Sequence, residues 1–372
     1  MRLDRFAMRV LLVGNANSVH LVKIANSMAE HGFTIAIATL HGQSHELSSA
    51  VQVYDLGKIY KGLGYFKFRT LQKIELEFKP DVVNSHYATG YGLLASRSKC
   101  ARRVVSVWGS DVLLFPKKSI FHRSLVKAIL RKYTHCFSTS KIMIKEVKKL
   151  RGDIPVSLTP FGVNTELFVP GPEVKPDAGK VVIFGTVRSL KKVYGIDRLI
   201  VEFAEAERLL KKTGACFPPL RLRIVGGGAE RGNLEALVSK LGISDSVEFI
   251  GAVPNDRIPS ILQEMDIFVA LSRSESFGVA VIEAQACALP VVVSDVGGLP
   301  EVVVDGCTGV IVPEKNIPDA RQNFIELILD EELRLKMGRA GRKFVCDNFS
   351  LERTTMIYIK EIKKVANTGW YR

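Results

Sequence analysis

The chain has no uninterrupted apolar stretch near the ~18 residues that a membrane span needs. Its opening, MRLDRFAMRVLLVGN, pairs basic residues with a short apolar run, and no small-residue cleavage site follows. We interpret that run as a first β-strand of a cytoplasmic protein. With 372 residues, 47% of them hydrophobic, the chain is long enough for two domains, each with its own core.

Patterns typical of metal sites are also absent from the sequence. The six cysteines are scattered without a C-x-x-C pair, which predicts free thiols in a reducing compartment. All seven histidines lie between His20 and His135 without a convincing metal pair, and no D-x-D pair of carboxylates is present. We therefore predict no metal and no other cofactor.

Acidic residues are scarce in the first half of the chain. Residues 1–170 hold 25 Lys+Arg and 11 Asp+Glu, whereas residues 171–372 hold 27 of each, so the whole net charge of +14 lies in the first half. Much of it falls in residues 115–133 and 141–152, which are typical of amphipathic helices. Their expected apolar positions are Ile120, Leu125, Ile129, Ile142, Ile144 and Val147.

Two interpretations of these basic helices stay open. They are either solvated faces or a surface that meets anionic lipid headgroups or a phosphorylated partner. Nucleic acid is a weaker alternative, because the basic stretches lack interleaved aromatic residues and match no known nucleic-acid motif.

Short β-branched runs alternate with helical patterns along the whole chain. The first half contains RVLLVG, FTIAIATL, VQVYDL, DVVNSHY, RRVVSVW and HCFSTS, and the second contains KVVIFGTV, LRLRIVG, SVEFIG, DIFVALS, PVVVSDV and TGVIVP. Such alternation predicts an α/β fold with parallel sheets covered by helices. Between the halves, VPGPEVKPDAGK reads as a linker over residues 169–180. We expect two doubly wound domains, residues 1–168 and 181–348, facing a central cleft.

Ligands of doubly wound sheets bind beyond the carboxyl ends of the strands, so the loops there carry the functional candidates. GNANSVHL, with Gly14 and Asn15, follows the first strand but has one glycine where a dinucleotide fingerprint needs three. A nicotinamide dehydrogenase is therefore disfavoured. The loop is either a plain turn or a helix N-terminus that receives a phosphate or a sugar hydroxyl.

The loop FGTVRSLKKVYGID gathers Arg188, Lys191 and Lys192 after the first strand of the second half. A diphosphate held in a partly dry site needs at least two positive partners, although surface lysines are common without any such role.

The stretch ESFGVAVIEA places Glu275 in a loop and Glu283 inside the helix that Gly278 opens. The backbone amides around Phe277 could bind a phosphate oxygen. Glu275 could equally be a helix cap, and Glu283 a solvated helix position, but the apolar neighbours of Glu283 argue against the second alternative.

Two further candidates follow strands of the first half. Asp111 lies in VWGSDVL and His86 in NSHYATGYG. A turn aspartate is as good an interpretation of Asp111 as a site carboxylate.

With Glu275 and Glu283 in this context, the chain resembles the family-four group of retaining glycosyltransferases, which have the two-Rossmann architecture called GT-B. The resemblance covers nearly the whole chain, through an ordered set of segments: VWGSDVL, TPFGVNTELFVP, VVIFGTVRSLKKVYGIDRLI, LRIVGGGAERGNLEAL, VEFIGAV, MDIFVALSRSESFGVAVIEA and VGGLPEVVVDGCTGVIV.

The resemblance implies a role for each domain, with the acceptor in the first and the nucleotide-sugar in the second. On the donor side it gives Glu283 the ribose hydroxyls, Glu275 the transferred sugar, and Arg188 with a lysine the diphosphate. The amides of Ser276, Phe277 and Gly278 would meet the sugar or the distal phosphate.

On the acceptor side, the resemblance implies that Gly14 and its neighbour Asn15 close over the diphosphate. From their places after strands of the first half, we also predict that His86 contacts substrate and that Asp111 takes part in the transfer. The final segment, residues 349–372, would cross back to the first domain as a helix.

The chain departs from the family pattern in three places. The usual R-x4-K-G becomes Arg188 followed by SLKKVYG, which displaces the lysine, and we favour Lys192 over Lys191 for the phosphate. Trp108-Gly109 stands where the family often has His-Gly, so a histidine role is absent there. The usual Cys-Gly at the helix end is Cys287-Ala288.

These inferences predict a retaining glycosyltransferase that uses a UDP- or GDP-linked sugar and a glycan or lipid-linked acceptor. An anionic membrane is the partner expected for the basic first half, on the cytoplasmic face. Two alternatives stay open, a sugar-nucleotide epimerase and a non-catalytic sugar-nucleotide-binding subunit.

Overall fold

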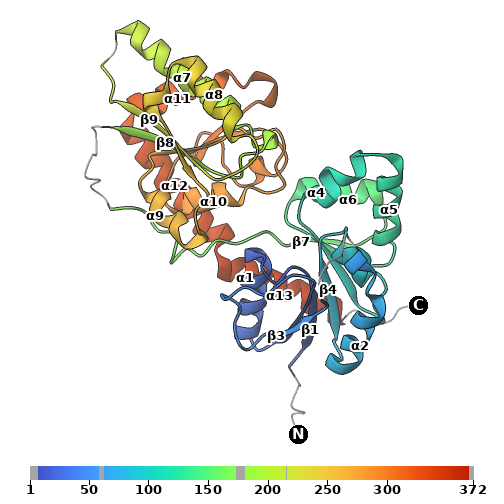
Figure 1. Cartoon of the computed structure of the whole chain (residues 1–372). Coiled ribbons are helices and arrows are strands. Elements are labelled where there is room, and N and C mark those ends of the chain that lie inside the picture. Colours follow the sequence, from blue (N-terminus) through green and yellow to red (C-terminus); the bar gives the residue numbers. More distant parts are fainter. Residues whose placement is uncertain (1–6, 58–62, 173–180, 215, 368–372) are drawn as a thin grey trace. The chain divides into compact units, whose positions relative to one another are not determined.

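The computed structural model describes residues 7–57, 63–172, 181–214 and 216–367. Residues 173–180, most of the expected linker, lie outside the described residues. The chain divides into two compact units, one made of residues 1–161 and 352–372 and the other of residues 162–351 (Figure 1). Both are α/β units built on a parallel sheet, which confirms the predicted fold class.

The first unit contains a seven-stranded parallel sheet in the order β3-β2-β1-β4-β5-β6-β7. Each of the six runs predicted as strands in this half forms one. The strands are β1 (Arg9–Val13), β2 (Thr34–Thr39), β3 (Gln52–Asp55), β4 (Val82–His86), β5 (Arg103–Val107), β6 (His135–Ser138) and β7 (Val156–Leu158). The central strands are buried on both faces, as parallel strands covered by helices must be.

Helices cover both faces of this sheet. They are α1 (Val19–Glu30), α2 (Phe68–Phe78), α3 (Tyr91–Ala95), α4 (Ser110–Leu113), α5 (Ile120–Leu130), α6 (Lys141–Leu150) and α13 (Leu351–Asn367). One core joins α2, α3, α5 and α6 to one face of the sheet, and a second core joins α1 and α13 to the other. In Figure 1, α13 (red) lies beside α1 (blue).

The second unit contains a six-stranded parallel sheet in the order β10-β9-β8-β11-β12-β13. Its strands are β8 (Val182–Val187), β9 (Leu220–Val225), β10 (Val247–Gly251), β11 (Ile267–Ala270), β12 (Val291–Ser294) and β13 (Gly309–Val312). Its helices are α7 (Ile196–Thr213), α8 (Arg231–Leu241), α9 (Ile258–Gln263), α10 (Val279–Ala286), α11 (Asp319–Leu329) and α12 (Glu331–Phe349). A large core joins α7, α8 and α11 to the sheet, and α12 packs on α10.

Strand order reverses beside the first strand of each sheet. In the first unit β1 lies between β2 and β4, and in the second β8 lies between β9 and β11. The crossovers on either side of such a point leave in opposite directions, so the loops after the two strands diverge and leave space for a ligand. The loops that begin at Gly14, Tyr87, Arg188 and Leu271 all start at these points, and His86 is the last residue of β4.

Two details differ from the expectation. Residues 162–168, expected in the first domain, group with the second unit, because Arg342 on α12 donates hydrogen bonds to the carbonyl oxygens of Thr165 and Phe168 at 3.0 and 2.6 Å. On α5, Ile120 and Leu125 are exposed, and the helix packs instead through Val126, Ile129 and Leu130.

Among the helices of the described residues, none has both the length and the apolar character required to cross a membrane.

The packing of α13 predicts that the first unit depends on this last helix. Ile362 is fully buried against the sheet, so Ile362→Ala should lower the free energy of unfolding of the first unit by about 2–5 kcal/mol. Urea unfolding followed by tryptophan fluorescence measures this, since both tryptophans lie in that unit's sequence. Met356→Ala, on the exposed side of the same helix, is the control and should change the value by less than about 0.5 kcal/mol. Equal effects of the two changes would contradict the described packing.

Candidate active site

Arg188, the first residue after β8, is held by three groups of the second unit. Its Nη1 donates to Ser272 Oγ at 3.0 Å, and its Nη2 donates to the carboxylate of Glu275. The guanidinium carbon also lies 4.6 Å from the centre of the Tyr194 ring, a cation–π distance. Strands β8 and β11 are neighbours in the sheet. Arg188 therefore meets Ser272 and Glu275 at one sheet edge, although they lie 84 and 87 positions further along the sequence.

The ion pair of Arg188 and Glu275 is nearly buried, with 7% and 11% of the two side chains exposed. An isolated charge at this depth would be costly, whereas each partner here neutralises the other. The structure therefore brings together two residues predicted from separate loops, one for the diphosphate and one for the sugar. Removing either partner would leave the other as a buried, uncompensated charge.

Lys192 begins a short 3-10 helix (Lys192–Tyr194) and is mostly exposed, with its Nζ 3.9 Å from the Asp197 carboxylate. Arg273 holds the same Asp197 in a two-point pair at 2.7 and 2.6 Å, and this pair ties the first turn of α7 to the loop after β11. Lys191 is also exposed. Both lysines lie on the loop that Arg188 begins, so the choice of Lys192 over Lys191 stays a prediction.

Close backbone approaches fix the turn between Glu275 and α10. A Cβ added to Gly297 would lie 1.7 Å from the carbonyl oxygen of Glu275, and one added to Gly298 would lie 2.4 Å from that of Ser276. Gly278 precedes α10 with a φ of +107°, a conformation that side chains rarely adopt. Only glycine fits at these three positions, and they set where the helix begins.

The three residues predicted to offer amides differ in their surroundings. The Ser276 amide donates to Glu275 Oε1 at 3.2 Å, so it already has a carboxylate partner. The Phe277 ring is buried and packs on Phe349 with ring centres 5.7 Å apart, which makes it an anchor of the turn. Gly278 leads into the first turn of α10. The amides in the first turn of a helix have no carbonyl partner within that helix.

Glu283 is half-buried in a helix that is otherwise almost wholly apolar. Its neighbours Ile282 and Ala284 are fully buried. The structure therefore excludes the alternative of a fully solvated helix position.

In the first unit, Gly14 directly follows β1 at the point where strand order reverses. Its amide donates to the Ala38 carbonyl at 3.1 Å, and a Cβ there would lie 2.8 Å from Leu21 and 3.3 Å from His86. Asn15 follows, and its side-chain oxygen accepts from the Asn17 amide at 2.9 Å. The loop is therefore a tight turn that brings Asn15 and His86 to the same edge of the sheet.

Asp111 is buried, and both carboxylate oxygens accept hydrogen bonds from backbone amides. Oδ1 accepts from Trp108 and Gly109 at 3.3 and 2.9 Å, and Oδ2 accepts from Ala88 at 2.8 Å. Burial raises the pKa of Asp111, while these amides oppose the rise. Asp111 thus ties the loop after β4 to the loop after β5. These contacts favour a positioning role over the predicted direct part in the transfer.

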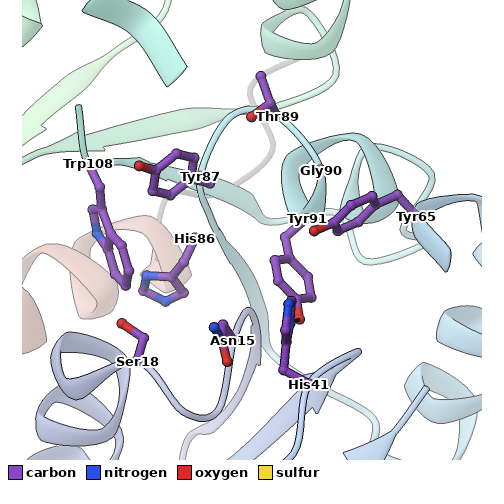
Figure 2. Close-up of a pocket in the computed structure, with 10 residues that line it drawn as sticks. All are labelled: Asn15, Ser18, His41, Tyr65, His86, Tyr87, Thr89, Gly90, Tyr91 and Trp108. Carbon is purple, nitrogen blue, oxygen red and sulfur yellow. Dashed lines mark hydrogen bonds between the residues drawn. The ribbon is translucent and has the colours of Figure 1, made fainter. Parts of the chain in front are cut away.

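His86 lines a pocket of about 320 Å³ in the first unit, together with Asn15 (Figure 2). The pocket also contains residues that were not predicted as site residues: Ser18, His41, Tyr65, Tyr87, Thr89, Gly90, Tyr91 and Trp108. They come from the loops after β1, β2, β4 and β5 and from the segment before α2, so no local sequence pattern shows that they meet. Ser272 and Tyr194, which hold Arg188, were missed for the same reason.

Within the described residues, no group of three His, Cys, Asp or Glu side chains is placed to hold a metal ion.

The fold and these sites define a glycosyltransferase of the two-Rossmann, GT-B class. Residues 172–344 match the family model of glycosyl transferases group 1, and residues 9–140 match that of glycosyl transferase 4-like proteins. The two models between them match most of the chain, and the chain belongs to the family-four type of glycosyltransferase.

The chain is similar to several curated proteins. It is 28% identical over 280 residues to an uncharacterized glycosyltransferase of Methanocaldococcus jannaschii, covering 74% of this chain and 73% of that protein. It is 35% identical over 176 residues to the D-inositol 3-phosphate glycosyltransferase of Mycolicibacterium smegmatis, covering 46% of this chain but only 39% of that relative.

Solved structures show the same fold at low identity. Sucrose-phosphate synthase from Thermosynechococcus elongatus superimposes with a TM-score of 0.81 and 18% identity, covering 97% of this chain and 100% of that one. Anabaena HepE, in complex with UDP and glucose, superimposes with a TM-score of 0.78 and 16% identity over 96% and 100% of the two chains.

The burial of His86 predicts a pH dependence of stability. Burial lowers the pKa of His86 from its usual 6.5 to about 3, so the folded chain keeps the ring neutral. Between pH 6.5 and 3 the unfolded chain binds the extra proton, so this contribution is complete above pH 6.5 and is lost as the pH falls. The free energy of unfolding should fall by up to about 1.4 kcal/mol per pH unit through this group.

Urea unfolding of the first unit at pH 6.5, 5.5 and 4.5 measures this slope. His86→Phe should flatten it, whereas His31→Phe, at an exposed position of the same unit, should not flatten it by the same amount. A slope in His86→Phe as steep as in the original chain would show that His86 is not held neutral.

Proposed function

We propose that the chain is a retaining glycosyltransferase that moves a sugar from a nucleoside-diphosphate sugar to a glycan or lipid-linked acceptor. Its place would be the synthesis of a cell-surface polysaccharide or glycolipid. The observation that carries the proposal is the Arg188–Glu275 pair beside the N-terminus of α10, in a chain of this transferase family.

The second unit would hold the donor. Arg188 would bind the diphosphate through guanidinium hydrogens not used by Ser272 and Glu275, since arginine has five N–H donors. Lys192 would add a second positive charge and Glu283 would accept hydrogen bonds from the ribose. HepE in complex with UDP-glucose supports a UDP-linked donor, and a GDP-linked donor is the alternative.

Breaking the anomeric bond places negative charge on the departing diphosphate. Arg188, Lys192 and the first amides of α10 would stabilise that charge in the transition state. Both oxygens of Glu275 have donors, one from Arg188 and one from the Ser276 amide, which weakens the carboxylate as a nucleophile. We therefore favour front-face attack assisted by the leaving phosphate over a covalent glycosyl-enzyme, and we propose no metal.

A thermal-shift panel of UDP-, GDP- and ADP-sugars tests the donor site. A true donor at 100 times its Kd should stabilise the second unit by ~2.7 kcal/mol and raise its melting temperature. Glu283→Ala should keep the fold and lose most of that shift. Glu235→Ala, which removes an exposed partner of Arg231, is the matched control and should retain it. An undiminished shift in Glu283→Ala would remove the ribose assignment.

Incubation with radiolabelled donor and membrane lipid then separates the three activities. Label in the lipid fraction supports transfer, isomerised free donor supports an epimerase, and bound but unchanged donor supports a non-catalytic subunit.

The acceptor would bind the first unit, and we propose that this unit docks on an anionic membrane at the cytoplasmic face. Between Asp111 and Glu146 the sequence has eight Lys and Arg and no Asp or Glu. In the same segment Ile120 and Phe121 are 75% and 82% exposed at the start of α5. Exposed apolar side chains among basic ones fit a lipid headgroup region, where each basic residue contributes ~1 kcal/mol.

Vesicle sedimentation tests this docking. The chain should bind vesicles containing phosphatidylserine at least tenfold more strongly than neutral vesicles at low salt. Changing both Ile120 and Phe121 to Ser should reduce that binding by about tenfold or more. Leu76→Ser is the control, because Leu76 is equally exposed but lies between Glu75 and Glu77. Equal binding to anionic and neutral vesicles would refute the docking.

A further inference from the structure

The pocket of the first unit has walls of aromatic rings and no charge. Of its ten described lining residues, six carry rings, namely His41, Tyr65, His86, Tyr87, Tyr91 and Trp108, and none is Lys, Arg, Asp or Glu. In Figure 2 the rings of Trp108 and Tyr91 stand on opposite sides, with Asn15 between them. This lining contrasts with the net charge of +14 in the same half of the sequence. The basic residues therefore serve some other surface than this pocket.

His86 supplies the second observation. It is buried, lines the pocket, and neither ring nitrogen has a hydrogen-bond partner among the described residues. A buried polar group without a partner costs about 1–3 kcal/mol, so its retention points to a partner supplied by a ligand. A neutral imidazole offers one donor and one acceptor. A hydroxyl group, which both donates and accepts, matches it.

The other polar groups of the pocket have the same character. Asn15, Ser18 and Thr89 are neutral side chains that both donate and accept. The Tyr91 hydroxyl is fixed by His41 Nδ1 at 2.6 Å and by the Leu40 amide at 2.9 Å, so that ring cannot easily move aside. The polarised C–H bonds of a sugar ring pack well against the negative face of such aromatic rings.

We propose that this pocket binds the accepting end of the acceptor, and that this end is an uncharged ring bearing several hydroxyl groups, a sugar or a cyclic polyol. The inference rests on the proposed transferase function and adds the chemical class of the acceptor. A volume of about 320 Å³ is at the low end for small-molecule sites, which suits one such ring rather than a chain of them.

A phosphorylated ring is the competing ligand, because α1 starts at Val19 beside the pocket and its N-terminus favours anions. A comparison of the two energies involved decides against a phosphorylated ring. A helix terminus contributes only about 0.3–1 kcal/mol, whereas taking a charge out of water without a cationic partner costs several kcal/mol.

Trp108 provides a direct signal for the test. The sequence has two tryptophans, so Trp370→Phe leaves Trp108 as the single emitter. In that background, the Trp108 emission is measured while a neutral ring is added: methyl α-D-mannopyranoside, methyl α-D-glucopyranoside, methyl β-D-galactopyranoside or myo-inositol. Mannose 6-phosphate and glucose 6-phosphate are added in the same way for comparison. At least one neutral ring should change the Trp108 emission saturably, and the phosphorylated sugars should bind at least tenfold more weakly.

His86→Phe separates ligand binding from a structural role. It removes both unpartnered nitrogens but keeps a ring of similar size, so at pH 7.5 stability should be unchanged or higher while binding weakens about tenfold. His31→Phe, outside the pocket, should leave binding unchanged. Tighter binding of a phosphorylated sugar, no response to any neutral ring, or an unchanged titration in His86→Phe would each overturn the inference.

Donor binding, measured by thermal shift on the same protein, depends on the second unit and keeps the two proposals apart. If Trp108 responds to a neutral ring but no donor binds and no sugar is transferred, the proposed function fails alone. If sugar is transferred only to phosphorylated acceptors, the inference about the pocket fails alone.

Discussion

The reversal of strand order beside β1 and β8 is the constraint on which both candidate sites depend. Parallel strands end at one edge of a sheet, and right-handed crossovers that leave in opposite directions part the loops at that edge. Arg188 and Glu275 meet because β8 and β11 are neighbours. Asn15 and His86 meet because β1 and β4 are neighbours. The same topological device thus builds two sites of opposite character, one charged and one neutral.

The two sites handle the cost of burying polar groups differently. In the second unit the charge of Glu275 is matched by Arg188, and Ser272 and Tyr194 hold the guanidinium in place. In the first unit the Asp111 carboxylate is satisfied by three backbone amides, whereas His86 has no described partner. The side chains that position loops, such as Asp111, thus have hydrogen-bond partners within the chain. The ring nitrogens of His86, which we propose for a ligand, have no described partner.

The sequence was sufficient to predict every strand of the described residues except β7, and to point to the loops after them, whereas the roles of the predicted site residues stay predictions. Runs such as RVLLVG and KVVIFGTV contain enough β-branched residues to be recognised, and parallel strands buried on both faces need such runs. Strand β7 was not predicted, because its three residues are too few to show the alternation of apolar and polar residues that is typical of a strand. The exposure of Ile120 and Leu125 could not be foreseen, since apolar spacing on a helix does not say which apolar residues find a core. Pairings across loops, such as Arg273 with Asp197, need the strand order, which local patterns do not contain.

The return of α13 to the first unit has a consequence for synthesis on the ribosome. The first sheet is translated early, yet α13, which covers one of its faces together with α1, emerges only after the whole second unit, residues 162–351, has been made. At elongation rates of ~5–20 residues per second, that interval lasts roughly 10–40 s. For that time Val10, Leu12 and Phe137 lack the cover that Ile359 and Ile362 later provide. The nascent first unit is thus exposed to chaperones or to aggregation for as long as the second takes to appear.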